Sequence, residues 1–273
     1  MEASVTYPGS DMPGALWSLD RGRSPIIGTA IHNGHQVWPH LAATMALGDE
    51  GRRREEDPFT AETIRDVPNR LVVHRSRFEV DLNRAPEEAV YMRPEQSWGL
   101  TVWREVPAGE MLAALLREHA DYYALLRHVL SEMAAEHGRF VLLDMHSYNH
   151  RRAGPEAPPT PQEAAPDVNI GTFSMDRDRW AHVLDPFIDC LREQRVRGRP
   201  LDVRENVAFE GRGEQTRFVH RHFPQTGCAI AVELKKIFMD EWTGAPDPAA
   251  VAELRAAVRA SLPVLEAALG ALP

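Results

Sequence analysis

The stretch MLAALLREHADYYALLRHVLSEMAAEHGRFVLLDMHSY, residues 111–148, contains a helix, a stop and a strand in close succession. Its first part repeats apolar residues at spacings of three and four, which predicts a helix over residues 108–137. Gly138 fits the end of that helix. The apolar run RFVLLD, residues 139–144, then predicts a buried strand that carries DMHSY at its C-terminal end.

The same pattern recurs on both sides of this stretch. The runs PIIGTAI, residues 25–31, and CAIAVEL, residues 228–234, predict two further buried strands. Residues 176–197 predict a helix, and so does the Ala- and Leu-rich tail from about residue 247, which Pro263 is expected to kink or divide. Strands that alternate with helices indicate an α/β fold, with a central sheet covered by helices on both faces.

Four segments without a predicted helix complete the predicted layout. Residues 1–24, rich in Gly, Pro and Ser, predict an irregular lead-in, and residues 25–273 are expected to form one domain. Residues 48–60 are polar and predict a loop, and residues 78–82 predict extended chain. The segment 151–166 contains five prolines and predicts a flexible loop beside the site.

Composition excludes several function classes. The chain has 273 residues, 43% of them hydrophobic, which is enough to build a core. The net charge of −9 argues against nonspecific binding of nucleic acid. Cys190 and Cys228 are the only cysteines, so a cysteine zinc site is excluded. There is no secretory leader pattern and no apolar run of about 18 residues, so we expect a cytoplasmic protein without membrane spans.

Three titratable residues fall at or near the ends of the predicted strands. His32 follows the first strand, His146 the second, and Glu233 lies at the end of the third. In open α/β sheets, ligands bind at the C-terminal edge of the strands. The sequence therefore predicts a functional site where these three residues meet.

The histidines of this edge suggest a metal centre. His32 and His35 form an HxxH pair on a predicted turn, and His146 would supply a third imidazole, leaving one position open as catalytic zinc requires. Asp144 is a candidate for orienting His146. A carboxylate could replace His35, and the candidates for that exchange are adjacent in sequence: Glu55, Glu56 and Asp57.

The motif DLNR offers a clamp for an anion. Arg84 can bind a carboxylate bidentately, and Asn83 adds a neutral donor. Arg77 could stabilise the oxyanion of a reacting carbonyl, with Arg75 as a competing candidate. An ordinary ion pair with Glu79 or Asp81 is the alternative for these arginines.

Glu233 ends an apolar strand, where burial should raise the pKa of its carboxyl group. A general base that takes a proton from metal-activated water suits such a position. The alternative is an ion pair with Lys235 or Lys236.

Together these residues resemble the N-formylglutamate amidohydrolase family, whose relatives include zinc carboxypeptidases and aspartoacylases. Five blocks carry the resemblance and span roughly residues 26–242: AIHNGH, SRFEVDLNR, LLDMHSY, PDVNIGT and ENVAFEGRGEQTRFVHRHFPQTGCAIAVELKKIFMDE. The resemblance implies a single carboxypeptidase-like domain, with a mixed, mostly parallel sheet and one zinc ion. It also implies His32 and His146 as ligands, Asn83 and Arg84 as the carboxylate site, and Glu233 as base and proton shuttle.

The chain departs from the family pattern in two places. HxxH stands where the carboxypeptidases have HxxE, which leaves the third ligand open and could admit another divalent metal. The segment ENVAFEGRGEQ, residues 205–215, replaces a more glycine-rich loop, so the acyl group need not be formyl.

We therefore expect a zinc-dependent amidohydrolase that cleaves a small N-acyl amino acid, with Glu233 as general base and Arg77 at the oxyanion. Two alternatives remain. One is a metallopeptidase that releases a terminal residue from a short peptide. The other is a relative that binds metal or ligand without catalysis.

Overall fold

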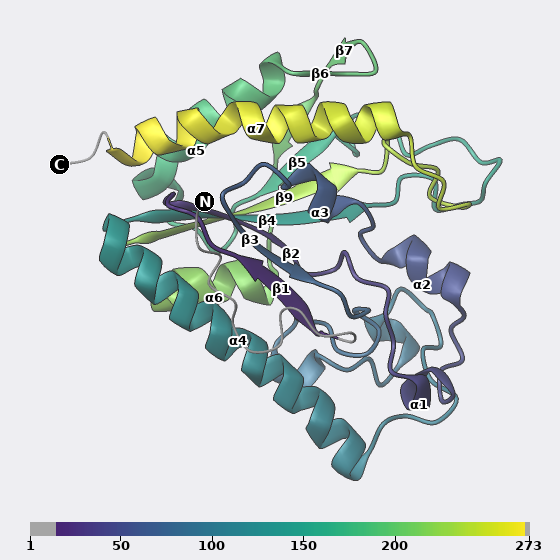
Figure 1. Cartoon of the computed structure of the whole chain (residues 1–273). Helices are drawn as coiled ribbons and strands as arrows, with labels where there is room; N and C mark the ends of the chain where they lie inside the picture. Colours follow the sequence, from purple (N-terminus) through teal and green to yellow (C-terminus); the bar gives the residue numbers. More distant parts are fainter. Residues whose placement is uncertain (1–14, 271–273) are drawn as a thin grey trace.

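A seven-stranded sheet forms the centre of the molecule (Figure 1). The structure is a computed structural model and describes residues 15–270. The strand order is β1-β3-β2-β4-β9-β5-β8. The strands are β1 (Trp17–Asp20), β2 (Ile26–Ala30), β3 (Asn69–Val73), β4 (Phe140–Tyr148), β5 (Val168–Gly171), β8 (Val203–Glu205) and β9 (Gly227–Lys235). A separate hairpin consists of β6 (Arg195–Val196) and β7 (Arg199–Pro200).

The sheet is mixed and mostly parallel, which confirms the predicted fold class. Strands β3, β2, β4 and β9 run parallel to one another. Strand β1 pairs antiparallel with β3, and β5 pairs antiparallel with β9, while β8 runs parallel to β5. The four parallel strands in the middle therefore end at one common edge.

Helices cover both faces of this sheet, as predicted (Figure 1). They are α1 (Pro39–Ala42), α2 (Asp49–Glu55), α3 (Thr60–Thr63), α4 (Gly109–His137), α5 (Arg177–Glu193), α6 (Glu214–His222) and α7 (Pro248–Gly270), with two short 3-10 helices, η1 (Pro86–Glu88) and η2 (Pro94–Gln96). Helices α5 and α7 pack on one face, and α4 and α6 on the other. None of the helices in residues 15–270 is long and apolar enough to cross a bilayer.

Strand β4 shows why two core layers form. Its side chains alternate between the faces, as the period of two in a strand requires. Val141 and Leu143 pack with α5 and α7, whereas Phe140 and Leu142 pack with α4 and α6. All nine residues of β4 are buried, as expected for a central strand covered on both faces.

Several predicted segments differ from the structure. The lead-in expected over residues 1–24 includes a strand, β1, which pairs in register with β3. Residues 1–14 lie outside the described part of the chain. Pro263 does not divide the C-terminal helix, since α7 continues through it to Gly270.

Two further corrections concern segments that reach the site. Residues 49–55, expected as loop, form helix α2, whose polar composition hid its period. Residues 78–82, expected to be extended, include turns at Phe78, Glu79 and Leu82, and Arg75 and Arg77 each pair with an acid four residues on. The proline-rich segment 151–166 contains no helix or strand, as predicted.

Candidate functional site

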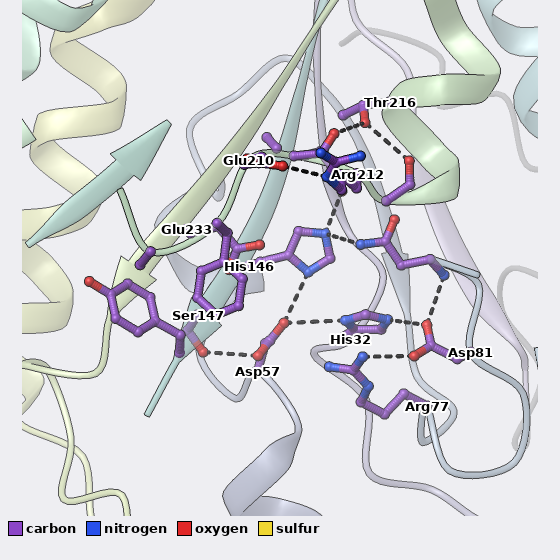
Figure 2. Close-up of a pocket in the computed structure, with 18 of the residues that line it drawn as sticks. His32, Asp57, Arg77, Asp81, His146, Ser147, Glu210, Arg212, Thr216 and Glu233 are labelled. Atoms are coloured by element: carbon purple, nitrogen blue, oxygen red, sulfur yellow. Dashed lines mark hydrogen bonds and ion pairs between the residues drawn. The ribbon is translucent and has the colours of Figure 1, made fainter. Parts of the chain in front are cut away.

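Two histidines and one aspartate converge at the C-terminal edge of β2 and β4 (Figure 2). His32 follows β2 by two residues, and His146 lies within β4. Because β2 and β4 are parallel neighbours, their ends bring the two imidazole rings to 4.8 Å between centroids. Asp57, which follows α2, places Oδ2 3.4 Å from Nδ1 of His32 and 3.1 Å from Nδ1 of His146.

This group fits a metal ion. The candidate ligand atoms of His32, Asp57 and His146 lie within 4.8 Å of one another, and all three residues are buried. Nδ1 of His32 is buried and makes no hydrogen bond, although Oδ2 of Asp57 lies 3.4 Å away. A buried polar atom without a partner is costly, and a cation at the centre of the group would satisfy it. Two imidazoles and a carboxylate form a donor set that suits zinc.

The outer nitrogens of both imidazoles face carboxylates. Nε2 of His32 is 2.7 Å from Oδ1 of Asp81, and Nε2 of His146 is 3.0 Å from Oδ1 of Asp144. A carboxylate at the outer nitrogen orients each ring and leaves Nδ1 as the atom that could bind a cation at the centre. This matches the expectation for Asp144, whereas the role of Asp81 was not anticipated.

Asp144 in turn accepts a hydrogen bond from Gln215. The side-chain amide of Gln215, in α6, donates to Oδ1 of Asp144 at 2.5 Å and to the hydroxyl of Thr29 at 2.7 Å. The hydroxyl of Tyr122, in α4, donates to the carbonyl oxygen of Gln215. Gln215 is fully buried, so this chain of contacts connects two helices to the orientation of His146.

Two further hydrogen bonds fix Asp57. Its backbone N–H donates to the carbonyl of His32 at 2.9 Å, and the hydroxyl of Ser147 donates to Oδ1 at 3.1 Å. Burial alone would raise the pKa of this carboxyl group, but the facing imidazoles of His146 and His32 hold the pKa well below its usual range. Asp57 is therefore an ionised carboxylate.

His35, expected as third ligand, lies outside this group. Its Nδ1 is 2.5 Å from Oε2 of Glu56, and about a quarter of its side chain is exposed. Glu55 pairs with Arg54 and Arg152. Of the sequence candidates for the third position, the structure brings only Asp57 together with His32 and His146.

Glu233 lies beside His146 in the sheet. The two residues are in register on the parallel strands β4 and β9. Burial raises the pKa of Glu233 to about 7, against the opposing effect of His146. Figure 2 shows Glu233 on one side of His146 and Asp81 on the other. An acid with such a pKa can accept and return a proton near neutral pH.

The DLNR turn is organised around Asp81. This fully buried carboxylate accepts from the guanidinium of Arg77 at 2.7 Å, from the hydroxyl of Tyr91 and from the backbone N–H of Asn83 at 2.8 Å. Burial opposes charge on Asp81, but Arg77 and His32 more than offset it and hold its pKa well below the usual range.

Asn83 and Arg84 follow on the same turn and line the cavity. Nδ2 of Asn83 is 3.3 Å from Nε2 of His146, and its Oδ1 faces Gly213, where a Cβ atom would approach to 2.3 Å. Arg84 donates to the carbonyl of Gln96 at 3.0 Å, but its ion pair with Asp81 is long, at 3.9 Å. The Arg84 guanidinium thus keeps donors for a ligand.

The two candidate oxyanion arginines differ in position. Arg75 forms two hydrogen bonds to Glu79, at 2.8 and 2.5 Å, and stacks on Trp38, away from the cavity. Arg77 lines the cavity, and its guanidinium lies 4.9 Å from the ring centroid of Trp98. Burial works against the charge of Arg77, but Asp81 offsets it and raises the pKa.

One cavity of about 650 Å³ opens onto most of these groups. Its walls include the three candidate metal ligands, Glu233 and the DLNR turn, together with the loop that connects β8 to α6. The arrangement brings together a metal-ligand group, a half-buried acid and cationic donors. These are the chemical parts that hydrolysis of an amide carrying a carboxylate requires.

Solved structures share this fold. An N-formylglutamate amidohydrolase from Ralstonia eutropha JMP134 superposes with a TM-score of 0.74 at 15% identity, over 94% of this chain and 100% of that one. The gene product Atu2144 from Agrobacterium tumefaciens superposes with a TM-score of 0.58 at 16% identity, over 92% of this chain and 96% of that one. No match was found among curated proteins.

The sequence itself supplies the family. Residues 24–239, most of the chain, match the N-formylglutamate amidohydrolase family. This range includes every site residue described above, and it confirms the resemblance seen in the sequence motifs. The chain therefore belongs to the N-formylglutamate amidohydrolase family, a family of hydrolases that act on amide bonds.

Proposed function

We propose that this protein is a zinc-dependent hydrolase of N-acyl amino acids. His32, Asp57 and His146 would hold the ion through Nδ1, a carboxylate oxygen and Nδ1. When bound, zinc would supply Lewis-acid chemistry that polarises the acyl carbonyl and makes water more acidic. The observation that carries the proposal is the convergence of these three ligands with Glu233 and Arg84 on one cavity.

Glu233 acts as the general base. Its carboxylate takes a proton from the attacking water and returns it to the leaving amine, so one residue serves both halves of the reaction. A pKa of about 7, raised by burial, suits both steps. The position next to His146 on β9 holds this carboxylate against the reacting centre.

Arg84 and Asn83 bind the carboxylate of the substrate. The guanidinium of Arg84 has no close carboxylate partner within residues 15–270, since its contact to Asp81 is 3.9 Å long. A planar guanidinium binds a carboxylate with two parallel hydrogen bonds and thereby orients the amide. Arg77, fixed by Asp81, carries the positive charge that stabilises the developing oxyanion.

Metal content and turnover of matched variants test this proposal. Elemental analysis of the purified protein should give about one zinc per chain, lost in His32→Ala, Asp57→Ala and His146→Ala. His35→Ala is the matched control, because His35 lies nearby but pairs with Glu56, and it should keep the metal. Turnover is measured on N-acyl amino acids and on short peptides.

Two results would contradict the proposal. One is a folded wild-type protein that binds no divalent metal after zinc is added. The other is a zinc-loaded protein that turns over peptides but no N-acyl amino acid, which would identify a peptidase instead.

A further inference from the structure

Three exposed apolar side chains line the same cavity. Trp98, Val207 and Phe209 are 46%, 39% and 41% exposed, and they are three of the five exposed large apolar side chains within residues 15–270. Single exposed apolar residues are common on any protein surface, but their collection in one hollow marks a binding surface. Trp98 lies against the guanidinium of Arg77, but the carboxylate clamp and the general base leave Val207 and Phe209 without a role.

Val207 and Phe209 are presented by a rigid backbone. Oδ1 of Asn169 accepts the N–H groups of Val207 and Ala208, both at 2.9 Å, and its amide donates to the carbonyl of Phe209 at 2.7 Å. Asn169 is fully buried. The ring of Phe209 also packs edge-on against Tyr148, at 5.4 Å between centroids. We call Val207 and Phe209 the apolar wall.

The strand order places this wall on the far side of the reacting centre from the clamp. Asn169 lies in β5, in register with Glu233 of β9, which is in turn in register with His146 of β4. The DLNR turn lies at the opposite end of this row, where Asp81 contacts His32 after β2. A substrate with its carboxylate on Arg84 and its amide at the centre therefore directs its acyl group toward the wall.

We propose that the acyl group of the substrate is an extended apolar one, aliphatic or aromatic, that packs against Val207 and Phe209. This inference rests on the proposed function. A formyl group carries no carbon beyond its carbonyl, so it would leave the wall in water. A cavity of about 650 Å³ lies within the range of about 300–1,000 Å³ that takes drug-sized ligands, well beyond the needs of a formylated amino acid.

The test compares acyl chain lengths on the zinc-loaded enzyme. The N-formyl, N-acetyl, N-hexanoyl and N-benzoyl derivatives of glutamate and of alanine are assayed, and kcat/KM should rise about tenfold or more from formyl to hexanoyl. Each buried methylene contributes up to about fourfold. Phe209→Ala and Val207→Ala should lower the hexanoyl-to-formyl ratio by about fivefold, with little change on the formyl substrate.

Phe173→Ala is the matched control. Phe173 is an exposed aromatic residue beside the same loop, but it does not line the cavity. The guanidinium of Arg212 lies over its ring, 3.5 Å from the ring centroid. This variant should keep the wild-type ratio. A ratio near one in the wild type, or a ratio that Phe209→Ala leaves unchanged, would overturn the apolar acyl group.

Binding separates this inference from the proposed reaction. The same compounds are titrated calorimetrically into zinc-loaded Glu233→Gln protein. Tighter binding of the hexanoyl compound that depends on Phe209, without turnover by the wild type, would support the wall and overturn the proposed hydrolysis. Equal binding of the formyl and hexanoyl compounds would overturn the wall whatever the wild type turns over.

Discussion

Glu233 and His146 are direct neighbours on the parallel strands β9 and β4. Because both strands are central and covered by helices, the spacing between the proposed base and the proposed ligand is set by the sheet and not by a loop. A base on a rigid strand keeps its position relative to the reacting atoms throughout the reaction.

Glu233→Gln should therefore leave zinc bound and lower kcat by roughly 10²-fold or more, because the amide keeps the shape of the side chain but cannot accept the proton. Metal content and kcat are measured on the same preparation. A variant that retains near-normal turnover would remove Glu233 from the mechanism.

Arg84→Ala should mainly raise KM for substrates with a free carboxylate, by about 10²-fold, since it removes a charge-assisted bidentate contact. A substrate with that carboxylate methylated serves as the control and should lose much less. Arg84→Lys keeps the charge but not the planar donor pair and should fall in between. An equal loss on both substrates in Arg84→Ala would contradict the carboxylate clamp.

The sheet and its functional edge could be predicted because apolar periodicity is a local signal. The runs at residues 139–144 and 228–234 correspond to parts of β4 and β9, and the parallel topology then brings His146 and Glu233 together. Residues 78–82 were predicted as extended chain, and the ion pair of Arg77 with Asp81 was kept only as an alternative, because nothing local decides whether that four-residue spacing closes.

The third member of the metal group could not be chosen from the sequence. Glu55, Glu56 and Asp57 are adjacent acids, and only the end of α2 decides which one faces the histidines. The backbone hydrogen bond from Asp57 to His32 fixes Asp57 toward the histidines. It joins residues 25 positions apart, and no sequence periodicity predicts such a contact. The role of Gln215 could not be predicted from the sequence either, because its hydrogen-bond partners come from three other elements.

Gln215→Leu should weaken zinc binding by about 10- to 100-fold, the usual effect of losing a group that orients a metal ligand. The leucine would leave Asp144 without the amide that holds it against His146. Tyr122→Phe is the graded control, because it removes only the far contact of the same chain. Competition with a zinc chelator measures both affinities. Wild-type affinity in Gln215→Leu would show that Asp144 is positioned without this amide.

His220 should make stability depend on pH between about 6.5 and 4. Its Nε2 accepts the backbone N–H of Ala229 at 3.1 Å, so the neutral ring donates from Nδ1 to the hydroxyl of Ser174 at 2.8 Å. Burial lowers the pKa of His220 to about 4, below its unfolded value of about 6.5. The folded state then binds fewer protons than the unfolded state in this window. The contribution of His220 to the free energy of unfolding is therefore complete above pH 6.5. It is lost as the pH falls toward 4, by at most about 3 kcal/mol.

Urea unfolding of His220→Gln and of the wild type measures this effect, with a chelator present so that metal ligands do not contribute. The free energy of unfolding should depend less steeply on pH in His220→Gln than in the wild type. Parallel slopes would mean that the ring is not held neutral, because removing a buried neutral imidazole must remove its share of the proton uptake on unfolding.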